Sequence, residues 1–123
     1  MSPKAKWPRV IEEAYCYWSM LRTLGFPSED LYLEVVGPRV TVVLYRDGST
    51  KPEDTFRANA GPYDGLTCEA FWQLWQKFVA DLASGKITDE ELEDIGRRSE
   101  ASTQKLEMLL ALRRRGFRLP FEG

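Results

Sequence analysis

The sequence predicts an α+β fold in which a three-stranded antiparallel meander carries helices, in the order α-β-β-β-α-α. The apolar residues repeat at three- and four-residue steps over residues 7–24, alternate along the middle of the chain, and return to helical spacing in the second half. A length of 123 residues suits one domain spanning 1–123. We expect flexible ends at residues 1–5 and 119–123.

The composition is typical of a folded, cytoplasmic protein: 43% of the residues are hydrophobic and 29% are charged. The formal net charge of −2 gives no general attraction to nucleic acid or anionic lipid. No apolar run reaches the ~18 residues of a membrane span, and no apolar segment follows Lys4 and Lys6, so we expect no membrane partner and no signal peptide. Cys16 and Cys68 are expected to be buried or half-buried thiols in a reducing compartment.

The chain contains no histidine. This removes the usual general base near neutral pH, the Ser-His and Cys-His nucleophile pairs, and the commonest transition-metal ligand. The spaced glycines and the Lys-Ser/Thr pair of a phosphate-binding loop are also missing from the sequence. We therefore predict that the protein is not an enzyme, with no catalytic residues, no cofactor and no metal.

Residues 7–24 predict the first helix. Its apolar face consists of Trp7, Val10, Ile11, Ala14, Tyr15, Trp18 and Leu21. Glu12 and Glu13 lie near the helix start, where negative charge is favourable. Gly25 supplies a left-handed C-terminal cap, and Pro27 prevents continuation.

The segment LYLEVVGPRVTVVLY predicts a β-hairpin whose two-residue loop, Gly37-Pro38, forms a type II′ turn. This register sorts the side chains onto an aliphatic face and a mixed face. The aliphatic face pairs Leu31 with Leu44, Leu33 with Val42, and Val35 with Val40. The mixed face pairs Tyr32 with Val43 and Glu34 with Thr41, and also holds Val36 and Tyr45.

A third strand is predicted over residues 55–60, between turn regions at 46–54 and 61–65. Phe56, Ala58 and Ala60 fall on one of its faces, and Thr55, Arg57 and Asn59 fall on the other. We expect the three apolar residues to extend the aliphatic face and the others to extend the mixed face.

The segment CEAFWQLWQKF lies in a second predicted helix, residues 68–84, which Thr67 caps and Ser84-Gly85 ends. Its apolar face consists of Cys68, Phe71, Trp72, Trp75, Phe78, Val79 and Leu82. No basic residue lies among these aromatic ones, as a base-stacking groove would require. We predict a core helix that packs, together with the first helix, on the aliphatic sheet face.

Thr88 and Glu91 predict a capping box for a third helix that ends in Arg113, Arg114 and Arg115 and can break near Gly96. Its face consists of Leu92, Ile95, Ser99, Ser102, Leu106, Leu109 and Leu110. Two placements follow from this pattern. The helix either crosses the mixed sheet face or extends away from the body and pairs with a partner.

The mixed sheet face and the C-terminal segment supply surplus apolar surface, so we predict that they bind a partner. The candidate residues are Tyr32, Val43, Tyr45, Arg57, Tyr63, Arg113, Arg114, Arg115, Phe117 and Arg118. The function that follows is that of a small cytoplasmic protein-interaction module, such as an adaptor, an inhibitor or immunity-type protein, or an assembly subunit. Its partner would be another protein or a second copy of the chain.

Nucleic-acid binding is the alternative function, through the arginine-rich helix end with Lys4, Lys6 and Arg9 nearby. The element order resembles that of double-stranded RNA-binding domains. That resemblance implies a lysine cluster at the start of the second helix, where this chain has Asp64 and Glu69.

A metal-dependent nuclease is the third hypothesis, because the element order also resembles that of restriction-nuclease-like proteins. The resemblance implies a metal held by acidic residues such as Asp47, Glu53 and Asp54. Here Arg57 stands three residues after Asp54, so the spacing departs from the pattern, which places the second acid two residues before a lysine.

Overall fold

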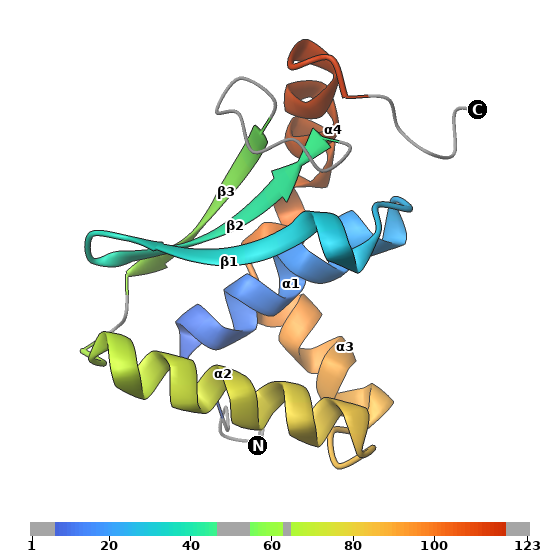
Figure 1. Cartoon of the computed structure of the whole chain (residues 1–123). Coiled ribbons are helices and arrows are strands. Elements are labelled where there is room, and N and C mark those ends of the chain that lie inside the picture. Colours follow the sequence, from blue (N-terminus) through green and yellow to red (C-terminus); the bar gives the residue numbers. More distant parts are fainter. Residues whose placement is uncertain (1–6, 47–54, 63–64, 118–123) are drawn as a thin grey trace.

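The computed structural model describes residues 7–46, 55–62 and 65–117 and confirms the α+β class (Figure 1). The elements are α1 (Arg9–Thr23), β1 (Leu31–Val36), β2 (Arg39–Tyr45), β3 (Thr55–Pro62), α2 (Cys68–Ala83), α3 (Asp89–Arg98) and α4 (Lys105–Arg114), with short 3₁₀ helices η1 (Ser28–Asp30) and η4 (Ala101–Gln104). The predicted flexible ends, 1–5 and 119–123, lie outside the described residues.

The sheet is antiparallel with strand order β1-β2-β3, and the predicted hairpin register is confirmed at every pair. Gly37 in the loop has φ 60°, the positive value that a type II′ turn requires at its first position. β3 runs two residues further than predicted, to Pro62, and contains a bulge. Asn59 pairs with Thr41 whereas Gly61 pairs with Val40, so Ala60 is the extra residue.

α1 lies across the aliphatic face, where it contacts β2 and β3 (Figure 1). It ends in the predicted glycine cap, since Gly25 has φ 104° and the Phe26 N–H donates to the Leu21 carbonyl. α2 lies on the same side of the sheet and packs against α1. The Phe78 ring contacts Trp7 at 5.1 Å and Tyr15 at 5.2 Å between ring centroids.

The aromatic stretch of α2 is a core segment, as predicted, but its buried stripe is narrower than expected. Phe71 and Phe78 are fully buried, and Trp72 and Trp75 are half-buried against the core. The expectation that Cys68 is buried or half-buried is wrong, because it is exposed. Val79, which was also assigned to the apolar face, is exposed too, since only the longer Trp72 reaches the core from that edge of the helix.

The third predicted helix is divided in two, and neither expected placement of it is correct. Thr88 caps α3 as predicted, but the helix ends at Ser99, whose ψ of 133° is extended. α3 contacts α1, and α4 stands at one end of the sheet (Figure 1). The break also changes the buried face, so that Leu106 and Leu110 are 68% and 44% exposed. Within the described residues, no helix has both the length and the apolarity that crossing a membrane requires.

Candidate functional site

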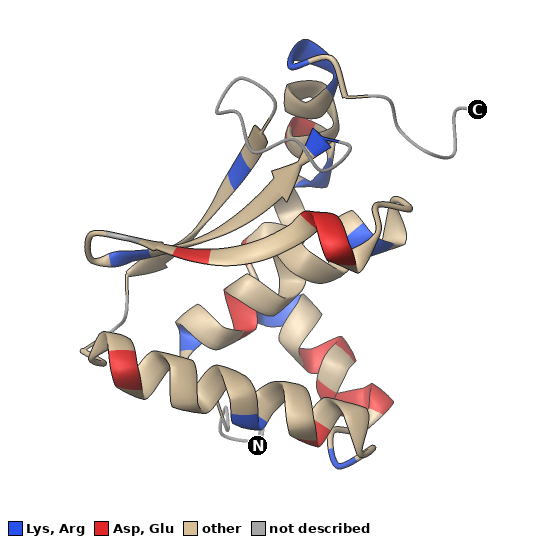
Figure 2. Cartoon of the chain, in the orientation of Figure 1, with Lys and Arg blue, Asp and Glu red and all other residues tan. Residues whose placement is uncertain are grey.

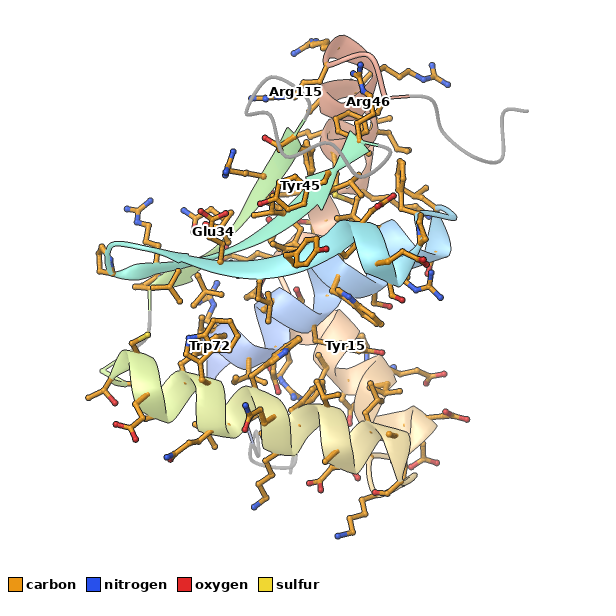
Figure 3. All side chains as sticks on the ribbon, viewed as in Figure 1. Tyr15, Glu34, Tyr45, Arg46, Trp72 and Arg115 are labelled. Atoms are coloured by element: carbon orange, nitrogen blue, oxygen red, sulfur yellow. The ribbon has the colours of Figure 1, made fainter. Side chains whose placement is uncertain are left out.

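The mixed side of the sheet forms the candidate functional site, which we call the open face. α1, α2 and α3 lie on the opposite side, and none of the described helices crosses this one (Figures 1 and 3). Strand alternation places Tyr32, Glu34, Thr41, Val43, Tyr45, Thr55, Arg57 and Asn59 on the open face. The structure therefore brings together four of the predicted partner-binding residues: Tyr32, Val43, Tyr45 and Arg57.

Tyr32 and Tyr45 form the aromatic centre of the open face. They are diagonal neighbours, because Tyr32 of β1 pairs with Val43 of β2. Their ring centroids are 5.1 Å apart and the rings meet edge to face at 72°. Tyr32 is 53% exposed, and Tyr45 is half-buried. An exposed aromatic pair of this kind is a surface on which a partner can gain binding energy by excluding water.

Val43 is fully buried although no described helix lies over it. It lies between its two cross-strand neighbours, Tyr32 and Arg57. It does not belong to the main core cluster. Val43 therefore supports the side chains around it and does not itself offer surface to a partner.

A charged pair joins the two edge strands across the open face. Arg57 Nη2 of β3 lies 3.5 Å from Glu34 Oε2 of β1, and both side chains are about 40% exposed. Arg57 Nη1 also donates to Thr55 Oγ1 at 2.9 Å. Glu34 and Tyr45 point to the same side of the sheet (Figure 3). The open face thus combines an aromatic centre with a mixed-charge polar rim.

The end of α4 docks on the body of the protein. Arg115 Nη1 donates to the Thr55 carbonyl at 3.0 Å, and Arg46 donates to the Arg115 carbonyl (Figure 3). The Arg46 guanidinium carbon lies 5.0 Å from the centre of the Phe117 ring, a cation–π contact. Phe117 is buried and meets Phe26 edge to face at 6.2 Å. Arg115 and Phe117 therefore hold the end of α4 against the body of the protein.

The other predicted residues do not join the open face. Arg113 and Arg114 are exposed in the last turn of α4, where basic side chains gather (Figure 2). Residues of the earlier hypotheses that lie outside the described part of the chain are Lys4, Lys6, Asp47, Glu53, Asp54, Tyr63, Asp64 and Arg118.

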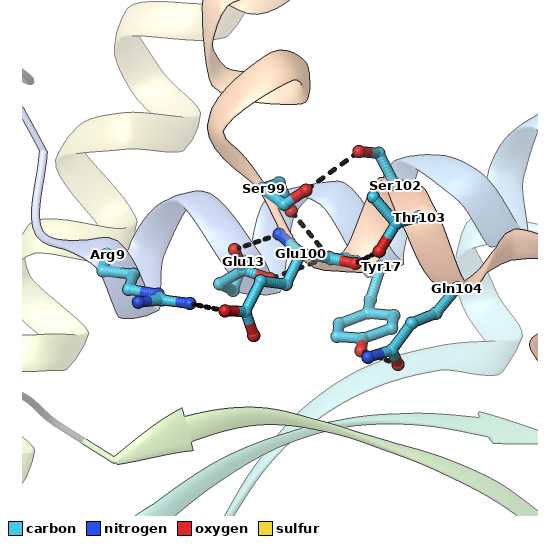
Figure 4. Close-up of polar contacts among 9 residues, drawn as sticks. Arg9, Glu13, Tyr17, Ser99, Glu100, Ser102, Thr103 and Gln104 are labelled. Carbon is cyan, nitrogen blue, oxygen red and sulfur yellow. Dashed lines mark hydrogen bonds and ion pairs between the residues drawn. The ribbon is translucent and has the colours of Figure 1, made fainter.

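A polar layer between α1 and the α3–α4 break was not predicted. The two carboxylate oxygens of Glu13 accept hydrogen bonds from the backbone N–H groups of Glu100, at 2.9 Å, and Ala101, at 3.1 Å (Figure 4). Glu13 therefore caps the start of η4 from a different helix. Beside it, Glu12 accepts from Arg98 Nη2 at 2.6 Å and from Nε at 3.3 Å. Both glutamates are buried.

The sequence held one signal for this layer. Glu12 and Glu13 stand between Ile11 and Ala14, so the acidic pair lies in the same turn as the residues predicted to be buried. Because every buried carboxylate requires partners, that position predicts a polar contact with another element. We expected Glu12 and Glu13 only to stabilise the helix dipole, because acidic residues near a helix start commonly do so.

Two titratable groups of α1, the side chains of Cys16 and Tyr17, have raised pKa values in the folded protein. Burial raises the pKa of the Cys16 thiol, the carboxylates of Glu13 and Glu12 raise it further, and a hydrogen bond with Ser99 partly offsets them. Burial likewise raises the pKa of Tyr17, aided by the Glu13 carboxylate. Both groups are therefore held in their neutral forms, which makes Cys16 a poor nucleophile. Within the described ranges, no three His, Cys, Asp or Glu side chains are grouped so as to hold a metal.

Fold and site together define an α+β protein with one helix-covered sheet face and one open face. Comparison of the chain with protein-family models, with curated proteins and with solved structures found no match. The functional proposal therefore depends on the geometry and chemistry of the open face itself.

Proposed function

We propose that this protein is a non-enzymatic, cytoplasmic protein-interaction module that binds a protein partner on its open face. The observation that supports the proposal is the exposure of Tyr32 on a sheet face that no described helix covers. Protein interfaces concentrate binding energy in aromatic side chains surrounded by a polar rim. An adaptor, an inhibitor or an assembly subunit would each use such a face.

The charges of the open face favour a protein partner over a nucleic acid. Arg57 is paired with Glu34, so it contributes little net positive potential. Phosphate backbones are bound by unneutralised Lys and Arg, and the affinity depends on their number. At the other candidate site, on α4, Arg113, Arg114 and Arg115 are all exposed, and Arg115 is held against the body of the protein because it donates to the Thr55 carbonyl.

Site-specific photo-crosslinking tests the proposal. A photoreactive phenylalanine analogue replaces Tyr32 in the full chain, which is expressed in its native cell. We expect a discrete adduct of higher mass, which mass spectrometry identifies as a protein. A matched control carries the same analogue at Gln76, an exposed position of α2 on the helical side of the sheet. No adduct is expected there.

Two further treatments separate the outcomes. Nuclease treatment should leave the Tyr32 adduct unchanged, and an excess of wild-type chain should abolish it, whereas the Tyr32→Ala chain should compete at least tenfold less well. A nuclease-sensitive adduct, or equal adducts from both positions, would contradict the proposal. An adduct of twice the chain mass would identify a second copy as the partner.

A further inference from the structure

A second feature lies along the outer edge of β3, next to the open face, with which it shares Arg57 and Asn59. β3 is an edge strand, because the sheet order is β1-β2-β3 and, among the described segments, only β2 pairs with it. A hollow of about 500 Å³ lies between this strand and α1, η4 and α4. Its lining includes Tyr17, Phe56, Ala58, Ala60, Gln104 and Met108. We call this hollow the β3 groove.

The groove follows from the small side chains of β3. Ala58 and Ala60 occupy the aliphatic side of this strand, where β2 carries Val42 and Leu44. An alanine side chain is too short to fill the space that a valine or leucine fills between a sheet and its helices. The bulge at Ala60, followed by Gly61 with φ 107°, adds local twist at the same end of the strand.

The charged groups around the groove are already paired. Arg9 Nη2 lies 2.6 Å from Glu100 Oε1, and both Glu13 oxygens accept backbone N–H groups (Figure 4). The Tyr17 hydroxyl donates to Gln104 Oε1 at 3.0 Å. The charges that line the groove are therefore neutralised by their partners, and the lining also carries the Gln104 carboxamide and the Tyr17 hydroxyl. These groups suit an uncharged ligand that both donates and accepts hydrogen bonds.

The groove also offers a ligand two further kinds of contact, apolar side chains at its floor and backbone groups along the strand edge. Phe56 and Met108 are buried apolar residues of the lining. An edge strand presents backbone N–H and C=O groups on its outer side, and these form a template for another strand. At one end Arg115 occupies the Thr55 carbonyl, and at the other the Gly61 N–H donates to Asn59 Oδ1 at 2.9 Å, so the accessible template is the stretch from Arg57 to Ala60.

We propose that the β3 groove binds an extended, uncharged peptide segment of the partner, which adds to the sheet beside β3 as a fourth strand. The inference rests on the proposed function only in that the ligand belongs to a protein. Phe56 to Pro62 line the groove, and at about 3.3 Å per residue this length accommodates roughly five or six residues. A folded edge, as in a second copy, is disfavoured because α1 and η4 wall the groove and would meet its helices.

The test uses the wild-type full chain and a displayed library of random twelve-residue peptides. The tightest selected peptide is labelled, and its Kd is measured by fluorescence anisotropy. Each peptide bond is then N-methylated in turn. Because successive residues of a strand direct their N–H groups to opposite sides, methylation at every second residue should weaken binding at least tenfold. Methylation at the intervening residues should change it less than twofold.

A groove-filling variant provides the second arm. Ala58→Leu should weaken the selected peptide at least tenfold, while its matched control, Ala80→Leu at an exposed position of α2, should bind as wild type. If Ala58→Leu fails to fold, the methylation series on the wild-type chain decides alone. An even methylation profile, or a library that yields no binding peptide, would overturn the proposal.

Other occupants give different results. Acidic peptides whose binding is lost on replacing Arg113 and Arg114 by alanine would locate the ligand on α4 and overturn the inference. A dimer that Ala58→Leu dissociates would identify a second copy, again against it. Tyr32→Ala should leave the peptide Kd within twofold. If no Tyr32 crosslink forms but the methylation profile alternates, the open-face proposal is refuted and the groove proposal is supported. If the Tyr32 crosslink forms but the methylation profile is even, the groove proposal alone is refuted.

Discussion

Val42 and Val43 are neighbours on β2 and are both completely buried, yet they are buried in different ways. Val42 faces α1 and belongs to the main core cluster, whereas Val43 faces the open side and lies between Tyr32 and Arg57. One sheet therefore has a thick apolar layer on one side and a single layer of side chains on the other.

The ion pairs of the two sides differ in the same way. Glu12, on the helical side, is nearly inaccessible and receives two hydrogen bonds from Arg98. Glu34, on the open face, is joined to Arg57 by one longer contact at 3.5 Å, and both side chains are substantially exposed. The helical side uses its charges to fix the positions of helices. The charges of the open face remain accessible to solvent.

The largest expected effect on stability comes from truncating the two neighbouring valines, Val42 and Val43. Val42→Ala should reduce the free energy of unfolding by about 2–3 kcal/mol, because a cavity forms between helix and sheet. Val43→Ala should cost only about 1 kcal/mol, since the exposed side chains above it can settle into the space. Urea unfolding followed by tryptophan fluorescence measures both. Equal losses would show that the open face is as rigidly packed as the core.

The next largest difference in stability is expected between the two ion pairs, Arg98–Glu12 and Arg57–Glu34. Arg98→Ala leaves the Glu12 carboxylate buried without its partner and should cost about 2 kcal/mol. Arg57→Ala, the matched change on the open face, should cost no more than about 0.5 kcal/mol, because water can solvate Glu34. Thermal unfolding of the two variants provides the comparison. A larger loss from Arg57→Ala would reverse the roles assigned to the two sides.

A loss of stability at alkaline pH is expected from the helical side of the sheet. The pKa of Cys16 is raised in the folded state above its usual value of about 8.5, so its contribution is present at neutral pH. This contribution should be lost as the pH rises above that usual value towards the raised folded-state pKa, because the unfolded chain releases the proton first. Cys16→Ala should unfold with a correspondingly shallower alkaline dependence. Identical pH profiles for the two chains would disprove the assignment.

The smallest stability change is expected at Tyr32. Tyr32→Ser should alter the free energy of unfolding by about 0.5 kcal/mol or less, because the ring is largely exposed. Partner binding should nevertheless fall sharply, so stability and binding separate at this residue. Circular dichroism during heating, together with the competition assay, measures the two quantities. A stability loss above about 1.5 kcal/mol would make Tyr32 a structural residue.

Local patterns predicted the sheet well. The hairpin register followed from the alternation around Gly37-Pro38, since a slip of one residue would exchange the two faces. The helix caps at Gly25, Thr67 and Thr88 could also be predicted, because each cap depends only on residues within one turn of the helix end.

A break near Gly96 was predicted, but its exact position could not be predicted from the residues of the helix alone. Gly96 was the natural candidate, but the chain turns at Ser99, where Glu13 holds the N–H groups of the next turn. Likewise, the placement of α4 away from the open face involves contacts with distant residues, among them the hydrogen bond from Arg115 to the Thr55 carbonyl. Contacts between residues so far apart leave no periodic pattern in the sequence.

The contact between Glu13 and the start of η4 has a consequence for the order of assembly. It joins residues 87 and 88 positions apart, with the whole sheet and α2 between them. At about 5–20 residues per second, synthesis of that intervening chain takes roughly 4–18 seconds. For this interval a carboxylate destined for burial has no backbone partner in the nascent chain. The contact that fixes the first helix can therefore form only after the start of η4 has been made.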